Sequence, residues 1–371
     1  MDIKKLINLE FQNLTPYQAG KPIEELAREK NLTNIIKLAS NENLLGPSPL
    51  VFKAIQKELS HLLYYPDPNN YALKQTLEQK YNISSDKIII GNGSDEIQLL
   101  ITRAFVNNQD EVIIPKYSFA NYKIIANAQR AKIIESDLDN NFYINIEDII
   151  KKITNRTKII YIANPGNPIS TYLYSDKIKY LLKNIDKNIL VLLDEAYFEY
   201  RLEFDSFDTV NLLNKFDNLI ITRTFSKAYG LAGLRAGYGF ANSQIINLLH
   251  QIKLPFNVNR LASIAAICAL DNLFLDDQKY ISKILEINHQ EKDFLYSQFN
   301  KLNLKYIKSY TNFITVKLDH PDKIYNYLLD KGIITRPLKN YSLDNYLRVT
   351  IGNHQQNIIF IEKFSKFLQK L

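Results

Sequence analysis

The stretch NILVLLDEAY, residues 188–197, decides the fold class of this chain. Its centre is apolar on both faces, and the apolar run ends on an acid, Asp194. Strands of a parallel sheet have this pattern, because helical layers cover both sides of the sheet. A carboxylate buried at the end of such a strand needs a cationic partner. The stretch therefore predicts a central strand of an α/β protein that brings an acid to the edge of its sheet.

Similar apolar runs, rich in β-branched residues, lie on both sides of this strand along the chain. The segments between them, such as 95–105 and 175–185, carry apolar residues at helical spacing. Alternation of buried strands with helices predicts a large domain with a mostly parallel, doubly wound sheet. The other expected strands are KIIIG (87–91), EVIIP (111–115), AKIIES (131–136), TKIIYIANP (157–165), NLIITRTFS (218–226) and AGYGF (236–240).

The sequence changes character after about residue 258, where a smaller α+β C-terminal domain is expected. We divide the chain into an N-terminal arm (1–40), a large domain (41–257) and a small domain (258–371). The arm, which includes a helix, should pack on the small domain or on a partner subunit. The small domain should contain helices at 260–274, 278–302, 322–331 and 355–370, and strands at 312–318, 332–338 and 346–352.

Composition excludes several classes of function. The net charge is +7, from 46 basic and 39 acidic residues, but the lysines are scattered, so we expect no nucleic-acid partner. None of the five histidines stands at metal-ligand spacing from another, and no apolar run is long enough to cross a membrane. The single cysteine, Cys268, lies in an apolar helical pattern and excludes an internal disulfide framework. A cytoplasmic protein without a signal segment is expected.

Four expected strand ends carry polar groups: GNGSDE (91–96), NPGNP (164–168), DEAY (194–197) and TFSKAYGLAGLR (224–235). Open α/β sheets bind ligands beyond the carboxyl ends of their strands, so these groups should converge on one site. A helix that begins near Ser94 or Asp95 would offer backbone N–H groups to a phosphate, or the same residues could simply cap the helix. Glu96 breaks the GxGxxG fingerprint and no Walker lysine follows, which disfavours a dinucleotide or ATP site.

Lys227 is the strongest chemical signal in the chain. It follows a strand, with Ser226 beside it and Arg235 downstream. A lysine buried near an arginine can lose its proton and attack a carbonyl group. The partner of Asp194 is either a cationic ring nitrogen of a cofactor or a structural salt bridge, and the residues alone leave both open.

The combination of NPGNP, DEAY and SKAYGLAGLR resembles the fold-type I aminotransferases that depend on pyridoxal 5'-phosphate (PLP). The arm LTPYQAGKPIEELAREKNLTNIIKLASNENLLGPSP (14–49), with YYPDP (64–68), is similar to the histidinol-phosphate aminotransferase family in particular. The resemblance runs from end to end of the chain. It implies a homodimer that transfers an amino group from L-histidinol phosphate to 2-oxoglutarate in histidine biosynthesis. Two other activities stay open, aromatic amino acid transamination and PLP-dependent threonine-phosphate decarboxylation.

The resemblance also assigns roles to the residues around the cofactor. Lys227 would carry PLP in a Schiff-base linkage and shuttle the proton, while Asp194 would pair with the pyridine nitrogen. Asn167 and Tyr197 would contact the phenolic oxygen of the cofactor, and Tyr117 would stack on its ring. The cofactor phosphate would be held by Ser94, Asp95, Ser226, Arg235 and, from the neighbouring subunit, Tyr65.

The substrate side of the resemblance rests on two arginines and one tyrosine. Arg336, Arg348 and Tyr17 match the places at which the family binds the substrate phosphate. At one point the chain departs from the family, because Ile169 and Ser170 follow Pro168 where a threonine and a glycine are usual. The lost glycine raises the question of the local backbone geometry. Tyr229 and Tyr71 could belong to the site or to the core, and we expect the core for both.

Overall fold

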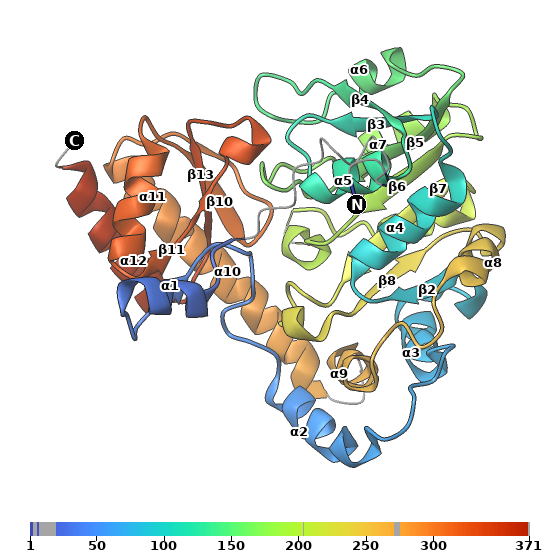
Figure 1. Ribbon diagram of the computed structural model, residues 1–371, viewed down its shortest axis with the longest axis horizontal. Coiled ribbons are helices and arrows are strands. Elements are labelled where there is room, and N and C mark those ends of the chain that lie inside the picture. Colours follow the sequence, from blue (N-terminus) through green and yellow to red (C-terminus); the bar gives the residue numbers. More distant parts are fainter. Residues whose placement is uncertain (3–5, 7–19, 203, 271–274, 370–371) are drawn as a thin grey trace.

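The computed structural model describes residues 1–2, 6, 20–202, 204–270 and 275–369. Figure 1 shows a large body built on one twisted sheet and a smaller body that holds the C-terminal strands and helices. The predicted α/β architecture, with a mostly parallel large sheet and a smaller C-terminal domain, is confirmed.

The large sheet has seven strands in the order β2-β8-β7-β6-β5-β3-β4. All neighbouring pairs are parallel except those that include β8, which runs antiparallel to both β2 and β7. The strand order reverses along the chain, as expected for a doubly wound sheet. The strands are β2 (Ile88–Gly91), β3 (Glu111–Pro115), β4 (Lys132–Ser136), β5 (Thr157–Ala163), β6 (Leu190–Asp194), β7 (Leu219–Thr224) and β8 (Gly237–Phe240).

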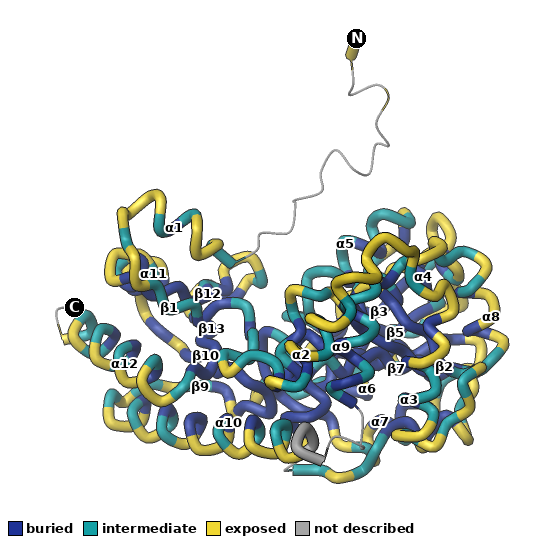
Figure 2. The backbone as a smooth tube through the Cα atoms, turned by 90° about the horizontal axis from the view of Figure 1, so that it is seen from below, coloured by how far each residue is buried: buried dark blue, intermediate teal, exposed yellow. Residues whose placement is uncertain are grey.

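Helices cover both faces of this sheet, and alternate residues of each strand point to opposite faces. On β6, for example, Leu192 packs in one apolar cluster and Leu193 in the other. Figure 2 shows the strands buried between helices whose outer sides are exposed. One cluster includes α4 (Ser94–Phe105), α5 (Ala120–Ala128) and α8 (Ser243–Ile252); the other includes α3 (Tyr71–Tyr81), α6 (Ile146–Lys151), α7 (Ser175–Lys183) and α9 (Arg260–Leu270).

One further helix, α2 (Pro49–Glu58), belongs to the large body. Ser48 caps this helix through its side chain, and the helix packs against α9. Tyr229 is buried in the core as expected, but Tyr71 is 68% exposed, so its placement in the core was wrong. Tyr71 opens α3, where its side chain points away from the buried positions Leu73 and Leu77. Short 3-10 helices span Leu59–His61, Ser85–Lys87, Phe198–Arg201, Thr209–Asn214, Ala232–Leu234 and Lys339–Tyr341.

The smaller body contains a four-stranded antiparallel sheet in the order β12-β13-β10-β9. Its closing helix, α12, begins with a capping box in which Asn353 and Gln356 each bond the other's backbone N–H. The elements are α10 (Leu275–Lys301), β9 (Tyr306–Ile307), β10 (Phe313–Lys317), α11 (Pro321–Asp330), β12 (Arg336–Pro337), β13 (Tyr346–Thr350) and α12 (His354–Leu368).

The single strand expected at 332–338 is divided in two. Its first half, β11 (Ile333–Ile334), pairs with β1 (Ile36–Lys37) near the N-terminus, and its second half joins the antiparallel sheet as β12. Helix α1 (Ile23–Lys30) buries Leu26 in the same small apolar cluster as Leu329. The described part of the N-terminal region therefore packs on the C-terminal body and carries the chain onward to the large sheet.

Candidate active site

The polar strand ends converge on one cavity at the carboxyl edge of the large sheet, as the sequence predicts. Side chains from the ends of β5, β6 and β7 and from the start of α4 line it. Eight of the predicted site residues belong to this lining: Ser94, Asp95, Asn167, Asp194, Tyr197, Ser226, Lys227 and Arg235.

Asp194 stands at the buried end of the cavity, at the last position of β6. Its side chain accepts hydrogen bonds from the Tyr122 hydroxyl at 2.6 Å and from the Thr222 hydroxyl at 3.3 Å. Burial raises the pKa of Asp194 to about 6, although both hydroxyls act in the opposite direction. The charged carboxylate is thus desolvated and contacts only neutral donors, which is the environment expected for an acid that binds a cationic ligand group.

Lys227 lies in the turn after β7, with its Nζ 3.0 Å from the backbone oxygen of Ser40. Burial lowers the pKa of Lys227 to about 8, and the positive charge of Arg348 acts in the same direction. A substantial neutral fraction is therefore present near neutral pH, and a neutral amine is the form that attacks a carbonyl carbon. The Nζ also lies 5.8 Å from the centre of the Tyr197 ring.

The Tyr197 hydroxyl is the meeting point of two asparagine side chains. It accepts hydrogen bonds from Asn41 at 2.8 Å and from Asn167 at 3.2 Å. The Oδ1 of Asn167 in turn accepts from Arg348 at 2.6 Å. This chain of contacts links the large sheet, the segment after β1 and strand β13 of the smaller body. Asn41 is a member that the sequence reasoning missed, because nothing in its local pattern marks it.

The opposite end of the cavity is built for an anion. Helix α4 begins at Ser94 after Gly93, which provides no side-chain cap, so its first backbone N–H groups stay available. The Arg235 guanidinium contacts the Ser226 hydroxyl at 3.3 Å and the Asp95 carboxylate at 3.2 Å. The Asp95 carboxylate would by itself repel a phosphate, and the ion pair with Arg235 offsets this repulsion. A Cβ on Gly93 would lie 2.7 Å from the Arg235 guanidinium and would push it aside, and the φ of 78° at this position also favours glycine.

Of the remaining predicted cofactor residues, Tyr117 and Tyr65 are described and are not part of this lining. Tyr117 packs near Ile169 and Phe142, while Phe119 and Tyr122 line the cavity in its place. Tyr65 is 76% exposed and stacks on Phe256 with ring centres 4.6 Å apart. Tyr17 lies outside the described residues.

The two arginines predicted for the substrate are neighbours across two strands. Arg336 on β12 stands opposite Arg348 on β13 in the antiparallel register, and both are buried. Directly opposed residues point to the same face of a sheet, and like charges placed so destabilise it. Two buried guanidiniums held side by side in this way form a suitable place for a dianion.

The departure from the family pattern lies at a backbone position that glycine would suit. Ser170 has a φ of 56°, in the left-handed region, and the turn keeps the conformation that its usual glycine permits. Its side chain is buried, and its hydroxyl has no hydrogen-bond partner. Asn167 keeps its contact with Tyr197, so the substitution strains the turn without displacing the site residue.

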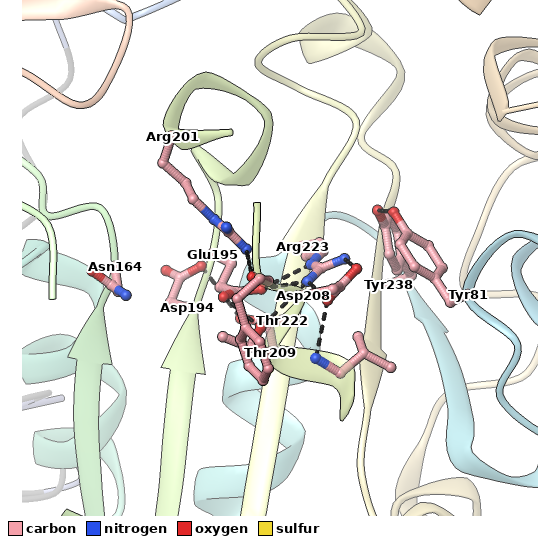
Figure 3. A network of polar contacts seen from close by, with 12 residues as sticks. Tyr81, Asn164, Asp194, Glu195, Arg201, Asp208, Thr209, Thr222, Arg223 and Tyr238 are labelled. Carbon is pink, nitrogen blue, oxygen red and sulfur yellow. Dashed lines mark hydrogen bonds and ion pairs between the residues drawn. The ribbon is translucent and has the colours of Figure 1, made fainter. Parts of the chain in front are cut away.

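Behind the cavity, on the opposite face of the sheet, lies a closed network of charges (Figure 3). Arg223 of β7 bonds the Glu195 carboxylate at 2.7 Å and the Asp208 carboxylate at 2.6 Å. The other oxygen of Glu195 accepts from Thr209 at 2.7 Å. The guanidinium also lies 3.4 Å from the centre of the Phe198 ring. This network joins the ends of β6 and β7 at residues next to the cavity-lining Asp194 and Thr224.

The donor set of the cavity fits PLP. A buried acid stands where a pyridine nitrogen would need a counter-ion, and a hydroxyl with an amide could contact the phenolic oxygen. A helix start with a serine and an arginine could hold the phosphate, and a lysine of lowered pKa could reach the aldehyde. Among the described residues, no group of three His, Cys, Asp or Glu side chains could hold a metal ion.

Comparisons with known proteins agree with this chemistry. Residues 33–364 match the family model "Aminotransferase class I and II". The chain is 41% identical to histidinol-phosphate aminotransferase 2 of Legionella pneumophila (strain Lens), over 99% of both chains, and 40% identical to that of Pasteurella multocida (strain Pm70), over 99% of this chain and 100% of the relative.

Solved structures show the same fold. The histidinol-phosphate aminotransferase from Sinorhizobium meliloti, in complex with pyridoxal-5'-phosphate, superposes with a TM-score of 0.87 at 23% identity, covering 98% of each chain. The enzyme from Clostridium acetobutylicum gives 0.83 at 28% identity, over 91% of this chain and 100% of that one. The chain belongs to the class I and II aminotransferase family.

Proposed function

We propose that the protein is a PLP-dependent histidinol-phosphate aminotransferase, which moves an amino group between L-histidinol phosphate and a 2-oxo acid such as 2-oxoglutarate. The observation that carries this proposal is that Lys227 and Asp194 line the same cavity. The chain also resembles histidinol-phosphate aminotransferases over its whole length. When bound, PLP would supply an electron sink that stabilises negative charge at the substrate carbon next to the amino group.

The residues of the chain would supply the remaining chemistry. Lys227 would hold the cofactor and then accept and return the proton at the substrate carbon, a task that suits an amine with a pKa of about 8. Asp194 would keep the ring nitrogen protonated. Tyr197 and Asn167 would hold the phenolic oxygen, and the start of α4 with Ser226 and Arg235 would anchor the phosphate. The stacking role of Tyr117 stays a prediction, and Phe119 is another aromatic ring in the cavity lining.

Substrate recognition would rest on Arg336 and Arg348. Histidinol phosphate carries a phosphate and no carboxylate, so two guanidiniums with bidentate geometry would fix its orientation. Arg336 and Arg348 stand directly opposite each other on β12 and β13, which supports the proposal that they bind the phosphate together. Tyr17 is the third residue predicted to contact the substrate phosphate.

A homodimer is the proposed functional unit. The large body exposes apolar and aromatic side chains along α2, the segment after it and the region around residue 255, a surface typical of an interface. Tyr65 belongs to this surface, away from the cavity of its own chain, in keeping with a role at the partner's cofactor phosphate. The exposed residues are Phe52, Leu59, Leu62, Leu63, Tyr64, Tyr65, Tyr71, Leu254 and Phe256.

We also propose a cytoplasmic location, because a chain with the single cysteine Cys268 does not rely on an oxidising compartment. Within the described residues, no helix is long and apolar enough to span a membrane. The division into an arm (1–40), a large domain (41–257) and a small domain (258–371) is likewise a proposal. The packing of α9 against α2 and α3 argues for moving the second boundary to the end of α9.

The first test is an absorbance spectrum of the purified protein before and after L-histidinol phosphate is added without a 2-oxo acid. We expect a visible cofactor band that is replaced by the band of the aminated cofactor, with no release of carbon dioxide. A band that responds to phenylalanine but not to histidinol phosphate would instead indicate an aromatic aminotransferase. Carbon dioxide release would indicate a decarboxylase, and no band after addition of PLP would refute the role of Lys227.

A further inference from the structure

Tyr122 of α5 makes the shortest polar contact to the acid of the site. Its hydroxyl lies 2.6 Å from the Oδ2 of Asp194, while the Oδ1 of Asp194 accepts the longer contact of 3.3 Å from Thr222, and the Gln98 amide also donates to this carboxylate. Tyr122 is fully buried, and its pKa is held well above the usual value, first by burial and then by the negative charge of Asp194. The hydroxyl therefore stays protonated and acts as a fixed donor.

Aromatic packing holds the Tyr122 ring in place. It stacks on Tyr161 of β5 with ring centres 5.2 Å apart, and it meets Phe119 edge to face at 5.9 Å. A side chain locked by its neighbours loses little entropy when it makes its hydrogen bond. The direction of the donor towards Asp194 is thus set by the packing of α5 on the sheet.

The charged and titratable groups near this contact include Asp95 and Tyr197, and Lys227 and Arg235 belong to the same cavity lining. Asp95 is near enough to raise the pKa values of both Asp194 and Tyr122, and the Tyr197 hydroxyl raises that of Tyr122. Gln98 of α4 contacts Thr222 at 3.5 Å and Asn121 at 3.5 Å, and Asn121 also contacts Asp95. Tyr122 is the donor with the shortest contact among those around the carboxylate.

We propose that Tyr122 is a positioning residue whose hydroxyl holds one oxygen of Asp194 so that the other is presented, ionised, to the protonated ring nitrogen of PLP. This inference rests on the proposed function. A carboxylate that loses such a donor is free to rotate and is protonated more readily in its buried site. Both changes would weaken its pairing with a cationic ring.

The test compares Tyr122→Phe with Tyr161→Phe in the full-length protein. The control removes a buried hydroxyl from the other ring of the same stacked pair, and that hydroxyl bonds Thr102 rather than Asp194. Apoprotein of each variant is titrated with PLP across a range of pH while the cofactor absorbance is followed. Thermal unfolding of each apoprotein reports whether the fold is intact.

We expect Tyr122→Phe to weaken PLP binding about tenfold near neutral pH, as for the loss of a hydrogen bond to a charged group. PLP affinity of the wild type should fall as the pH drops through about 6, where Asp194 takes up a proton. Because the Tyr122 hydroxyl lowers this pKa, its removal should move the fall in affinity to higher pH. Tyr161→Phe should leave both the affinity and the pH profile as in the wild type.

An unchanged pH profile in Tyr122→Phe would overturn the inference, and so would an equal loss of affinity in Tyr161→Phe. A second variant separates the role of Tyr122 from general packing. In an Asp194→Asn background, Tyr122→Phe should change PLP affinity less than twofold, because the charged acceptor is already gone. A tenfold effect in that background would show that Tyr122 acts by another route. If the wild type itself binds no PLP, the proposed function fails first.

Discussion

Two neighbouring positions at the end of β6 and two at the end of β7 show opposite ways of burying charge. Asp194 lines the cavity and Thr222 bonds it on the same side of the sheet, whereas Glu195 and Arg223 face the other side. Glu195 forms an ion pair with Arg223 at 2.7 Å; Asp208 also pairs with Arg223, and Thr209 donates a hydrogen bond to Glu195 (Figure 3). Asp194, in contrast, has neutral donors only, and its pKa is raised to about 6 by burial.

One face of these strands therefore contributes to stability and the other to function. A buried acid that is paired and hydrogen-bonded holds the strands in register, while an acid left without a cation keeps its binding capacity for a ligand. The period of two along a strand lets adjacent residues take these separate tasks. Substitutions on one face alone test this division of tasks.

The largest expected effect follows from Lys227→Ala. Turnover should fall by about 10⁴-fold or more, because the variant loses both the attachment point of the cofactor and the group that moves the proton. The apoprotein should remain folded, since the lysine is held in the site with a lowered pKa and so adds no stability by its charge. Steady-state kinetics and circular dichroism would measure the two effects.

Lys253→Ala is a matched control for this variant. Lys253 is another partly buried lysine with a lowered pKa, but it lies outside the active-site cavity. Its replacement should leave turnover within about twofold of the wild type. Full activity in Lys227→Ala would refute the mechanism.

The second prediction sets Arg223→Met against Asp194→Asn. Loss of the arginine leaves Glu195 and Asp208 without their shared cation, and it should destabilise the apoprotein by about 3–5 kcal/mol. Asparagine at 194 removes a charge whose ionised form burial disfavours, as the raised pKa shows, so at pH 7 it should be neutral or stabilising. Urea unfolding of both apoproteins measures the contrast, and equal losses would contradict the division of tasks.

The third prediction concerns the arginines that stand opposite each other in the smaller body. Arg336→Ala should raise the KM for histidinol phosphate about 10–100-fold, because charge-assisted contacts to the phosphate are lost. Turnover of phenylalanine should stay unchanged. Arg336→Lys keeps the charge but lacks the planar guanidinium, so its KM for histidinol phosphate should lie between those of the wild type and Arg336→Ala. An equal loss on both substrates would show that Arg336 supports the fold rather than the phosphate.

The sequence predicts those parts of the site that follow directly from strands. Asp194 and Lys227 stand where long apolar runs end, and a parallel sheet brings such ends together. Asn41 and Tyr122 could not be found in this way, because the segment after β1 and a helix bring them to the site from elsewhere in the chain. Their partners are set by tertiary packing, which local patterns do not encode.

Backbone detail was also beyond the sequence patterns. The run 332–338 reads as one strand, yet Thr335 separates two short strands that join different sheets. Tyr117 has a φ of 57°, and in the lining of the cavity Phe119 and Tyr122 appear where Tyr117 was expected. A positive φ at a tyrosine has no signature in the sequence, unlike one at glycine or asparagine.

The smallest expected effect comes from Ser170→Gly, which restores the residue usual at this turn. Ser170 has a φ of 56°, a conformation that costs a residue with a Cβ about 1 kcal/mol or more. Its buried hydroxyl also lacks a hydrogen-bond partner. Glycine removes both penalties but gains freedom in the unfolded chain, so we expect a net stabilisation of about 1 kcal/mol by urea unfolding.

Ser170→Ala separates the two contributions, because alanine loses the hydroxyl but keeps the Cβ. If Ser170→Ala gives most of the stabilisation seen with Ser170→Gly, the buried hydroxyl is the main penalty. If only Ser170→Gly stabilises the protein, the main penalty is the backbone conformation. Either result would leave PLP affinity unchanged, because Asn167 is already held by its contacts with Tyr197 and Arg348. A change in PLP affinity would instead show that strain in this turn reaches the cofactor through Asn167.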